Sequence, residues 1–318
     1  MKRIYLDQNI WIDLQMGRGL VSLIKVLEKI NRDEVEIVFS PANIEEIYHS
    51  YSGEGRKGKY IGMEDRDKRL DILAEVTQCK EIIPYPNGFN VLHSLHETYG
   101  PYIIRENPID CYKRIMDFYP SNTYAIKSQK KTIDISVGVD KGLKSKIGNK
   151  DFLDILKTDQ DLMDMLLDKI TINLIKKVAI DTMVARRMTI QPWNEEKNNY
   201  LIGMIEYILS NDINGYQKLA LGMINNTANI NIALKGFTVC EAVVEALMLT
   251  MLEYGFSPEK DSTSSLHDTT HAIYGSYCNF FVCRDAALMK KSKYIFKFLN
   301  SGTEIIDANN EDWSIYLQ

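Results

Sequence analysis

Short apolar strands alternate with helices at both ends of this chain, and no other feature constrains the fold as strongly. Near the start, strands are predicted at residues 3–7, 36–39 and 80–84. Helices are predicted around them, at residues 10–14, 20–30, from 40 onward, and 63–77. Near the end, helices at 266–278 and 286–299 alternate with strands at 279–283 and 304–306. This alternation is typical of an α/β fold.

The middle of the chain lacks this alternation. Its apolar spacing predicts helices at residues 151–188, 198–210, 215–228 and 238–254. A weak strand-like alternation occurs near 122–139. We therefore expect an α/β core made of residues 1–87 and 259–318, split by a mainly helical insertion at 88–258.

Composition excludes some classes of protein. The 318 residues carry a net charge of −5 and have a pI of about 5.7, which argues against a generally basic protein that coats nucleic acid. Five widely spaced cysteines argue against a disulfide framework and against a thiolate zinc site. No signal peptide and no apolar run of membrane-spanning length are present, so we expect a soluble cytoplasmic protein without a membrane partner.

Four acidic residues lie where predicted strands end or helices begin. They are Asp7, Glu46, Asp268 and Asp285. An α/β sheet presents functional groups to a shared crevice at such positions. Four carboxylates in one crevice suit Mg²⁺ or Mn²⁺, which prefer oxygen ligands, and two such ions activate water and stabilise the leaving oxygen in phosphodiester cleavage.

Each acid also has a reading without function. Asp7 and Asp285 have a residue type favoured at helix N-caps, and Asp268 is expected in the first turn of a helix, where the helix dipole stabilises it. Glu45 competes with Glu46 for the ligand role. Both readings stay open from the residues alone.

Two neighbouring side chains are expected to support these acids. Asn9 is expected to orient Asp7 or to complete a turn rather than to bind metal. His267 and His271 are four residues apart, a spacing that also occurs in zinc sites. We favour a role in phosphate contact or packing for one of them and choose His271 as the supporting residue.

The segments that carry these acids resemble the motifs of the PIN-domain superfamily of metal-dependent nucleases. Leu6-Asp7-Gln8-Asn9 resembles its opening motif, and the segment from Ser40 through Asn43 to Glu46 resembles its second motif, with Asn in place of Thr. Asp268 followed by His271 is similar to its third acidic helix. Val282-Cys283-Arg284-Asp285 resembles its last strand end, with Cys in place of Thr.

This resemblance implies a PIN-like parallel sheet flanked by helices and a divalent-metal-dependent endonuclease. It implies that Asp7, Glu46, Asp268 and Asp285 hold Mg²⁺ or Mn²⁺ directly or through water, and that RNA is the substrate. Free-standing members act as toxins or in defence against phage, so a regulatory protein partner is expected too. The alternatives are a catalytically inactive PIN-like module that binds nucleic acid or protein, and a DNA-directed structure-specific nuclease.

Basic residues cluster in two places despite the acidic total. Local patches of this kind bind a phosphate backbone or form an ordinary solvated face. The residues predicted to bind nucleic acid are Lys130, Lys131, Lys144, Lys146, Lys290 and Lys291.

Overall fold

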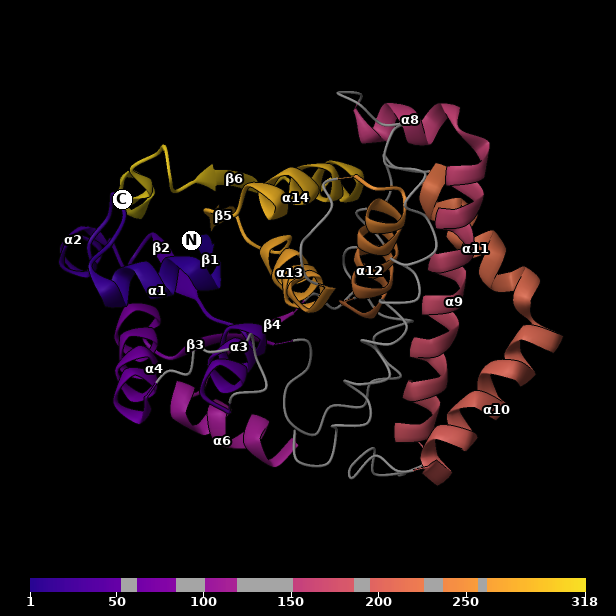
Figure 1. The fold of residues 1–318 in the computed structure, drawn as a ribbon, viewed down its shortest axis with the longest axis horizontal. Helices are drawn as coiled ribbons and strands as arrows, with labels where there is room; N and C mark the ends of the chain where they lie inside the picture. The colour runs from indigo at the N-terminus through magenta and orange to yellow at the C-terminus, as the bar shows by residue number, and fades with distance from the viewer. Residues whose placement is uncertain (53–61, 84–100, 119–150, 186–194, 226–236, 257–261) are drawn as a thin grey trace.

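The computed structural model of this chain describes residues 1–52, 62–83, 101–118, 151–185, 195–225, 237–256 and 262–318 (Figure 1). The predicted alternation near 122–139 lies outside these ranges, as do Lys130, Lys131, Lys144 and Lys146. The described part is an α/β protein built around a four-stranded parallel sheet that helices flank. The predicted fold class is confirmed at this level.

The parallel sheet combines strands from the two ends of the chain. Its strands are β1 (Lys2–Leu6), β2 (Val35–Val38), β5 (Phe280–Cys283) and β6 (Glu304–Asp307). Their order is β2-β1-β5-β6, and Leu6 of β1 pairs with Val282 of β5. The first strand is therefore joined directly to one that follows more than 270 residues later.

The sheet is buried on both faces, which explains its almost uninterrupted apolar strands. In β1, Ile4 and Leu6 belong to one buried cluster, whereas Tyr5 between them belongs to the other. The first face is covered by α1 (Gln8–Met16), α2 (Leu23–Lys29), α3 (Pro41–Ser52), α4 (Met63–Thr77), α6 (Pro108–Phe118) and the 3₁₀ helix η4 (Trp313–Leu317). The second face is covered by α12 (Phe237–Glu253), α13 (Ser262–Gly275) and α14 (Ala286–Leu299).

Local signals set several helix ends as predicted. The helices expected at 63–77 and 286–299 are confirmed with those bounds. Gly17 ends α1 in a left-handed conformation with φ of 64°, which glycine adopts without steric cost. Pro41 is the first residue of α3, where its missing N–H leaves no helical bond unmade.

A second, two-stranded sheet was only half predicted. β3 (Lys80–Ile83) was expected, but its antiparallel partner β4 (Tyr102–Arg105) and the following α6 were not. β4 is four residues long, too short for a periodic pattern to identify it. Because β4 pairs with β3 and α6 packs on α3 and α4, these elements of the predicted insertion contact the N-terminal ones.

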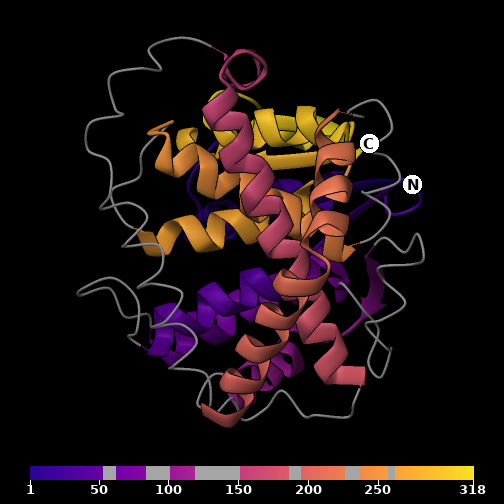
Figure 2. The same cartoon turned by 90° about the vertical axis from the view of Figure 1, so that its right-hand side faces the viewer.

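The middle helices form a separate layer beside the sheet. They are α8 (Phe152–Thr158), α9 (Gln160–Ala185), α10 (Glu195–Asn211) and α11 (Ile213–Asn225) (Figures 1 and 2). The single helix predicted at 151–188 is wrong, because Asp159 ends α8 in an extended conformation and its side chain accepts from the Leu162 amide of α9 at 3.1 Å. α12 lies between this layer and the sheet (Figure 1), and one buried cluster connects Leu166 of α9 with Tyr5 of β1. In the described ranges, no helix is long and apolar enough to cross a bilayer.

Candidate active site

Two of the predicted acids lie at the carboxyl ends of neighbouring parallel strands. Asp7 follows β1 and is 3% exposed, and Asp285 follows β5 and is exposed. Asp285 caps α14, because its Oδ1 accepts from the amides of Ala287 at 2.8 Å and Leu288 at 3.0 Å. Asp7 occupies the N-cap of α1 without a side-chain capping bond. Capping therefore accounts for one oxygen of Asp285 but not for the buried Asp7 carboxylate.

The sulfur of Cys283 lies between these two acids. Its Sγ is 3.6 Å from Asp7 Oδ2 and 3.3 Å from the amide nitrogen of Asp285. Burial raises the pKa of the Cys283 thiol well above its ordinary value, and the charges of Asp7, Asp285 and Asp268 add to this effect. Three of the four predicted acids therefore act electrostatically on one buried thiol.

Asn9 orients Asp7, as predicted. Its Nδ2 donates to Asp7 Oδ2 at 3.1 Å. Burial raises the pKa of Asp7, and the charge of Glu46 raises it further, whereas His271 opposes the shift. The carboxylate of buried Asp7 and that of half-buried Glu46 thus repel each other, an arrangement that a bound cation would stabilise.

Glu46 is positioned by α3, whose first turn is hydrogen-bonded to the end of β1. The Asn43 side chain accepts from the Ser40 amide at 3.0 Å and donates to the Leu6 carbonyl at 3.3 Å. Asn43 therefore performs a joining role at the position where the PIN motif has a threonine. Of the two candidate glutamates, Glu46 contacts His271, with 2.8 Å between its Oε1 and the histidine Nε2.

His271 belongs to a buried hydrogen-bond chain that sequence reasoning did not foresee. Its Nδ1 lies 2.7 Å from the hydroxyl of Tyr5, which lies 2.7 Å from the hydroxyl of Ser40. Burial alone would lower the pKa of His271, but the bond to Glu46 raises it, and the same bond lowers the pKa of Glu46 against the opposite effect of burial. The chain holds Glu46 in place through residues of β1 and α13.

Two further histidines lie beside Glu46. The rings of His49 and His267 are 5.4 Å apart between centroids, across the contact of α3 with α13. Burial lowers the pKa of His49 to about 4, and burial lowers that of His267 too, so both rings are neutral at pH 7. Sequence reasoning missed His49, since its sequence segment gives no sign of the contact with α13.

Asp268 lies in the middle of α13 and not in its first turn, because the helix begins at Ser262. The predicted stabilisation by the helix N-terminus is therefore wrong. Its Oδ2 lies 3.8 Å from Nζ of Lys291, which is 2% exposed. Burial lowers the pKa of Lys291 to about 8.

The two lysines after Asp285 therefore differ. Lys290 is exposed, with its Nζ 4.4 Å from the centre of the Phe256 ring. Lys291, predicted together with it as a nucleic-acid contact, points inward instead of contributing to a basic surface. Helical periodicity separates the two, because α14 buries one side of its circumference against the sheet.

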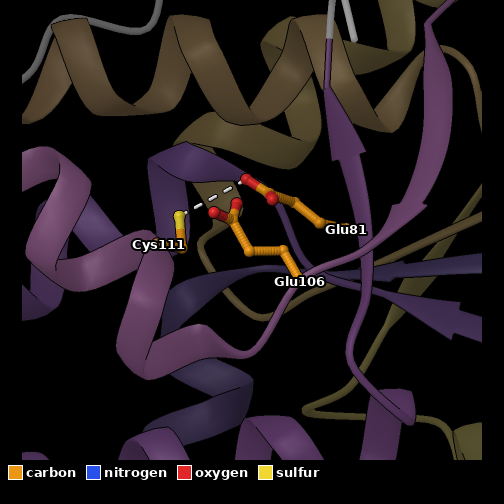
Figure 3. Close-up of side chains that lie close together, drawn as sticks. All are labelled: Glu81, Glu106 and Cys111. Carbon is orange, nitrogen blue, oxygen red and sulfur yellow. Dashed lines mark hydrogen bonds between the residues drawn. The ribbon is translucent and has the colours of Figure 1, made fainter. Parts of the chain in front are cut away.

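A second acidic cluster, absent from the sequence predictions, lies between β3, the end of β4 and α6. Among described residues, the one group of three or more metal-ligating side chains with all ligand atoms within 4.8 Å of one another is Glu81, Glu106 and Cys111 (Figure 3). The four predicted acids do not form such a closed group. The cluster already contains a cation: Nη2 of Arg114 lies 2.9 Å from Glu81 Oε1, 2.6 Å from Glu106 Oε2 and 3.3 Å from Cys111 Sγ.

The protonation of this cluster is dominated by burial. Burial raises the pKa of Glu81 to about 8, and its hydrogen bond with Glu106 raises it too, although Arg114 acts in the opposite direction. The pKa of Glu106 is lowered, because its bonds to Glu81 and Arg114 outweigh its burial. The pair therefore holds one proton at neutral pH, and its remaining charge is balanced by Arg114.

The chemistry of the two groups differs accordingly. The acids beside the parallel sheet offer only carboxylate oxygens, a donor set that suits Mg²⁺ or Mn²⁺. The Glu81 cluster has the composition of a metal site, but the guanidinium of Arg114 takes the cation position. Comparison with protein-family models, with curated proteins and with solved structures finds no match to this chain.

Proposed function

We propose that this chain is a divalent-metal-dependent endonuclease with a PIN-like fold. One observation carries the proposal: Asp7 and Asp285 end two adjacent parallel strands, with the Cys283 sulfur between them and under the influence of Asp268 as well. Carboxyl ends of neighbouring parallel strands are where α/β proteins commonly bind ligands. The motif resemblance and the α/β parallel sheet support the same conclusion.

The proposed cation would be held by Asp7, Glu46, Asp268 and Asp285, directly or through water. Bound Mg²⁺ or Mn²⁺ supplies Lewis acidity and makes water a better nucleophile at neutral pH. The chain's own residues orient the ligands: Asn9 orients Asp7, and His271 orients Glu46. Such second-layer contacts reduce the freedom of the ligands before the metal binds.

RNA is the proposed substrate, and this choice rests on the PIN resemblance alone. Exposed Lys290, five residues after Asp285 in the sequence, is proposed as a phosphate contact. The insertion lysines Lys130, Lys131, Lys144 and Lys146 are proposed as further phosphate contacts. A role as a toxin or anti-phage effector, controlled by a protein partner, is part of the same proposal.

A catalytically inactive binding module is the second candidate, and one observation favours it. The four acids do not bring three ligand atoms within 4.8 Å of one another, unlike the Glu81 cluster. An active enzyme would therefore require the metal or the substrate to draw the carboxylates together. A module that merely kept the fold would have no such requirement.

Cleavage of mixed nucleic acids separates the two candidates. Purified protein is incubated with RNA and DNA pools in Mn²⁺, in Mg²⁺ and in EDTA, and the new ends are mapped by sequencing. We expect cleavage of RNA that EDTA abolishes and that Asp7→Asn lacks. Cleavage of structured DNA instead would identify a DNA-directed nuclease.

The result that overturns the nuclease proposal is equally definite. Protein that binds RNA but leaves it intact in both metals, at any concentration up to the micromolar range, is a binding module. Activity retained in EDTA would contradict the metal mechanism while leaving the nuclease assignment in place.

A further inference from the structure

Arg284 lies beside the candidate active site without belonging to its group of acids. It directly follows β5, between Cys283, whose sulfur contacts Asp7, and Asp285. Consecutive Cα atoms are about 3.8 Å apart, so the Arg284 backbone is adjacent to both of these residues. The Asp285 side chain caps α14, whereas the Arg284 side chain turns toward α1, where its Nη1 donates to Oδ2 of Asp13.

A second arginine, Arg18, is brought to the same carboxylate by the end of α1. Gly17 ends the helix in a left-handed conformation, and the amides of Gly17 and Arg18 both donate to the Asp13 carbonyl. This turn brings Nε of Arg18 to 3.4 Å from Oδ1 of Asp13. Asp13 and Arg18 line the same small recess as Ala308, which follows β6, so the three charged groups lie on the carboxyl-end side of the sheet.

The exposure of these side chains shows which of them face solvent. The Asp13 side chain is 9% exposed, whereas those of Arg284 and Arg18 are 41% and 55% exposed. Among the described residues, Asp13 is the one acid that pairs with either arginine. Each guanidinium has five N–H donors in a planar fork that matches a phosphate group. The buried carboxylate therefore holds two partly exposed cations and leaves one positive charge in excess.

The Glu81 cluster has the opposite balance of charges. There, the guanidinium of Arg114 contacts two carboxylates. At Asp13, two guanidiniums contact one carboxylate. One cation is enough to balance one buried carboxylate, so the second arginine at Asp13 is not needed for that purpose.

We propose that Arg18 and Arg284 bind a phosphate of the nucleic-acid backbone, on the α1 side of the candidate active site. Arginine donates to phosphate with two parallel N–H groups, and both side chains are already held in place by Asp13. Asp13 lies six residues after Asp7, about 9 Å along α1. The pair therefore contacts a phosphate other than the one that is cleaved. This inference rests on the proposed function and adds a substrate contact to the same site.

The test measures the affinity of the full chain for a fluorescently labelled single-stranded RNA, by anisotropy, over a range of salt concentrations. EDTA is present, so that binding is read without metal-dependent cleavage, and a gel checks that the RNA stays intact. Arg18→Met and Arg284→Met each remove one charge, whereas Arg18→Lys and Arg284→Lys keep it. Arg105→Met is the matched control, because Arg105 is exposed at the end of β4 and its loss changes the net charge equally. Thermal unfolding checks that each variant folds.

We expect each methionine variant to bind the RNA roughly fivefold more weakly than wild type at 0.1 M salt. The slope of the logarithm of the binding constant against the logarithm of salt concentration should become shallower by about 0.7, the change for one lost phosphate contact on a single strand. The loss should be the same for RNAs of different sequence, because phosphate contacts carry no sequence information. The lysine variants should keep the wild-type slope, and Arg105→Met should keep both affinity and slope.

An unchanged slope in the folded methionine variants would overturn the inference. An equal loss in Arg105→Met would overturn it too, because the effect would then belong to the net charge and not to the arginine pair. Arg18 is the more exposed of the two residues, so Arg18→Met decides alone if Arg284→Met does not fold.

The proposed function fails in a different way. Wild type that cleaves RNA in Mn²⁺, while both methionine variants keep its salt slope, contradicts only the role of the arginine pair. Wild type that binds RNA without cleaving it contradicts the nuclease proposal, and a shallower slope in the two variants still supports the pair as a phosphate-binding site.

Discussion

Two groups of acids with a cysteine among them occur in the described part of the chain, and they differ in how their charge is balanced. In the Glu81 cluster, Arg114 reaches both glutamates and Cys111. At the carboxyl ends of the central strands β1 and β5, the Cys283 sulfur contacts Asp7 in a similar way. Of the four acids in this group, Asp268 has the Lys291 ammonium 3.8 Å from its Oδ2. In the first group one cation contacts all three members, whereas the contacts of the second group come from several different residues.

This difference teaches that close spacing of metal-ligating atoms is a weaker sign of a metal site than uncompensated charge. Glu81, Glu106 and Cys111 satisfy the spacing, yet an internal cation occupies their centre. The four acids are farther apart, yet each has an orienting donor and Asp7 is held beside another carboxylate. We therefore propose the functional site at the carboxyl ends of β1 and β5 and a structural role for the Glu81 cluster.

The largest expected effect is on catalysis. Asp7→Asn and Asp285→Asn should each lower the cleavage rate by roughly 100-fold or more, because losing a ligand should cost at least as much as losing a second-layer partner. Asparagine still caps a helix, so the thermal midpoint should change little. Glu106→Gln is the matched control in the other cluster and should retain wild-type turnover. Equal loss of activity in all three variants would contradict the proposal that the four acids, and not the Glu81 cluster, form the active site.

The next effect is on stability. Arg114→Met leaves the singly protonated Glu81–Glu106 pair without its cation and should lower the free energy of unfolding by about 2 to 3 kcal/mol, because the remaining negative charge of the pair then lacks a partner. Lys113→Met on the same helix breaks an exposed pair with Asp110 and should cost less than about 1 kcal/mol. Urea unfolding measures both. Similar losses in the two variants would show that Arg114 has no special role.

A third effect is a pH dependence that belongs to the Glu81 cluster. Glu81 has a folded pKa of about 8 against an ordinary value of 4.5, so its folded form binds more protons and stability falls as pH rises between these values. Glu81→Gln removes this loss, and its stability relative to wild type should improve by roughly 4 kcal/mol from pH 4.5 to 8. Glu106, Cys111 and Arg114 also face this group.

Urea unfolding of wild type and variant at several pH values provides the measurement. Glu106→Gln should give the opposite trend, because the folded pKa of Glu106 is lowered. Its contribution to stability is present above its ordinary pKa and is lost as pH falls through the folded value. A relative stability of Glu81→Gln that does not vary with pH would contradict the protonated state assigned to Glu81.

The smallest effect compares the two cysteines. Cys283→Thr introduces a hydroxyl beside Asp7 and should change the dissociation constant for Mn²⁺ by only a few-fold, because one weak thiol contact is replaced by a stronger donor. Cys111→Ser makes the corresponding change beside Glu81 and should leave Mn²⁺ binding unchanged. Calorimetry with both variants is the test. An effect of Cys111→Ser on the metal would shift the candidate site to the Glu81 cluster.

The sequence by itself predicted the features that depend on a few neighbouring residues. Apolar runs identified β1, β5 and α14, Gly17 marked the end of α1, and helix capping was one of the two readings left open for Asp285. Asn9 was expected to orient Asp7 or to complete a turn, and its side chain donates to Asp7. These features are local, so burial periodicity and capping preferences within about ten residues are enough to indicate them.

Only the tertiary structure decided which distant residues meet. Tyr5 bonds to His271, Asn43 bonds to the end of β1, and Arg114 enters between two glutamates, across separations that no local pattern reports. The sequence also placed Lys291 on a basic surface, whereas the packing of α14 on the sheet buries it beside Asp268. The residue type determines which charge a side chain can carry. Its partner depends on how segments far apart in the sequence are brought together and packed in the folded chain.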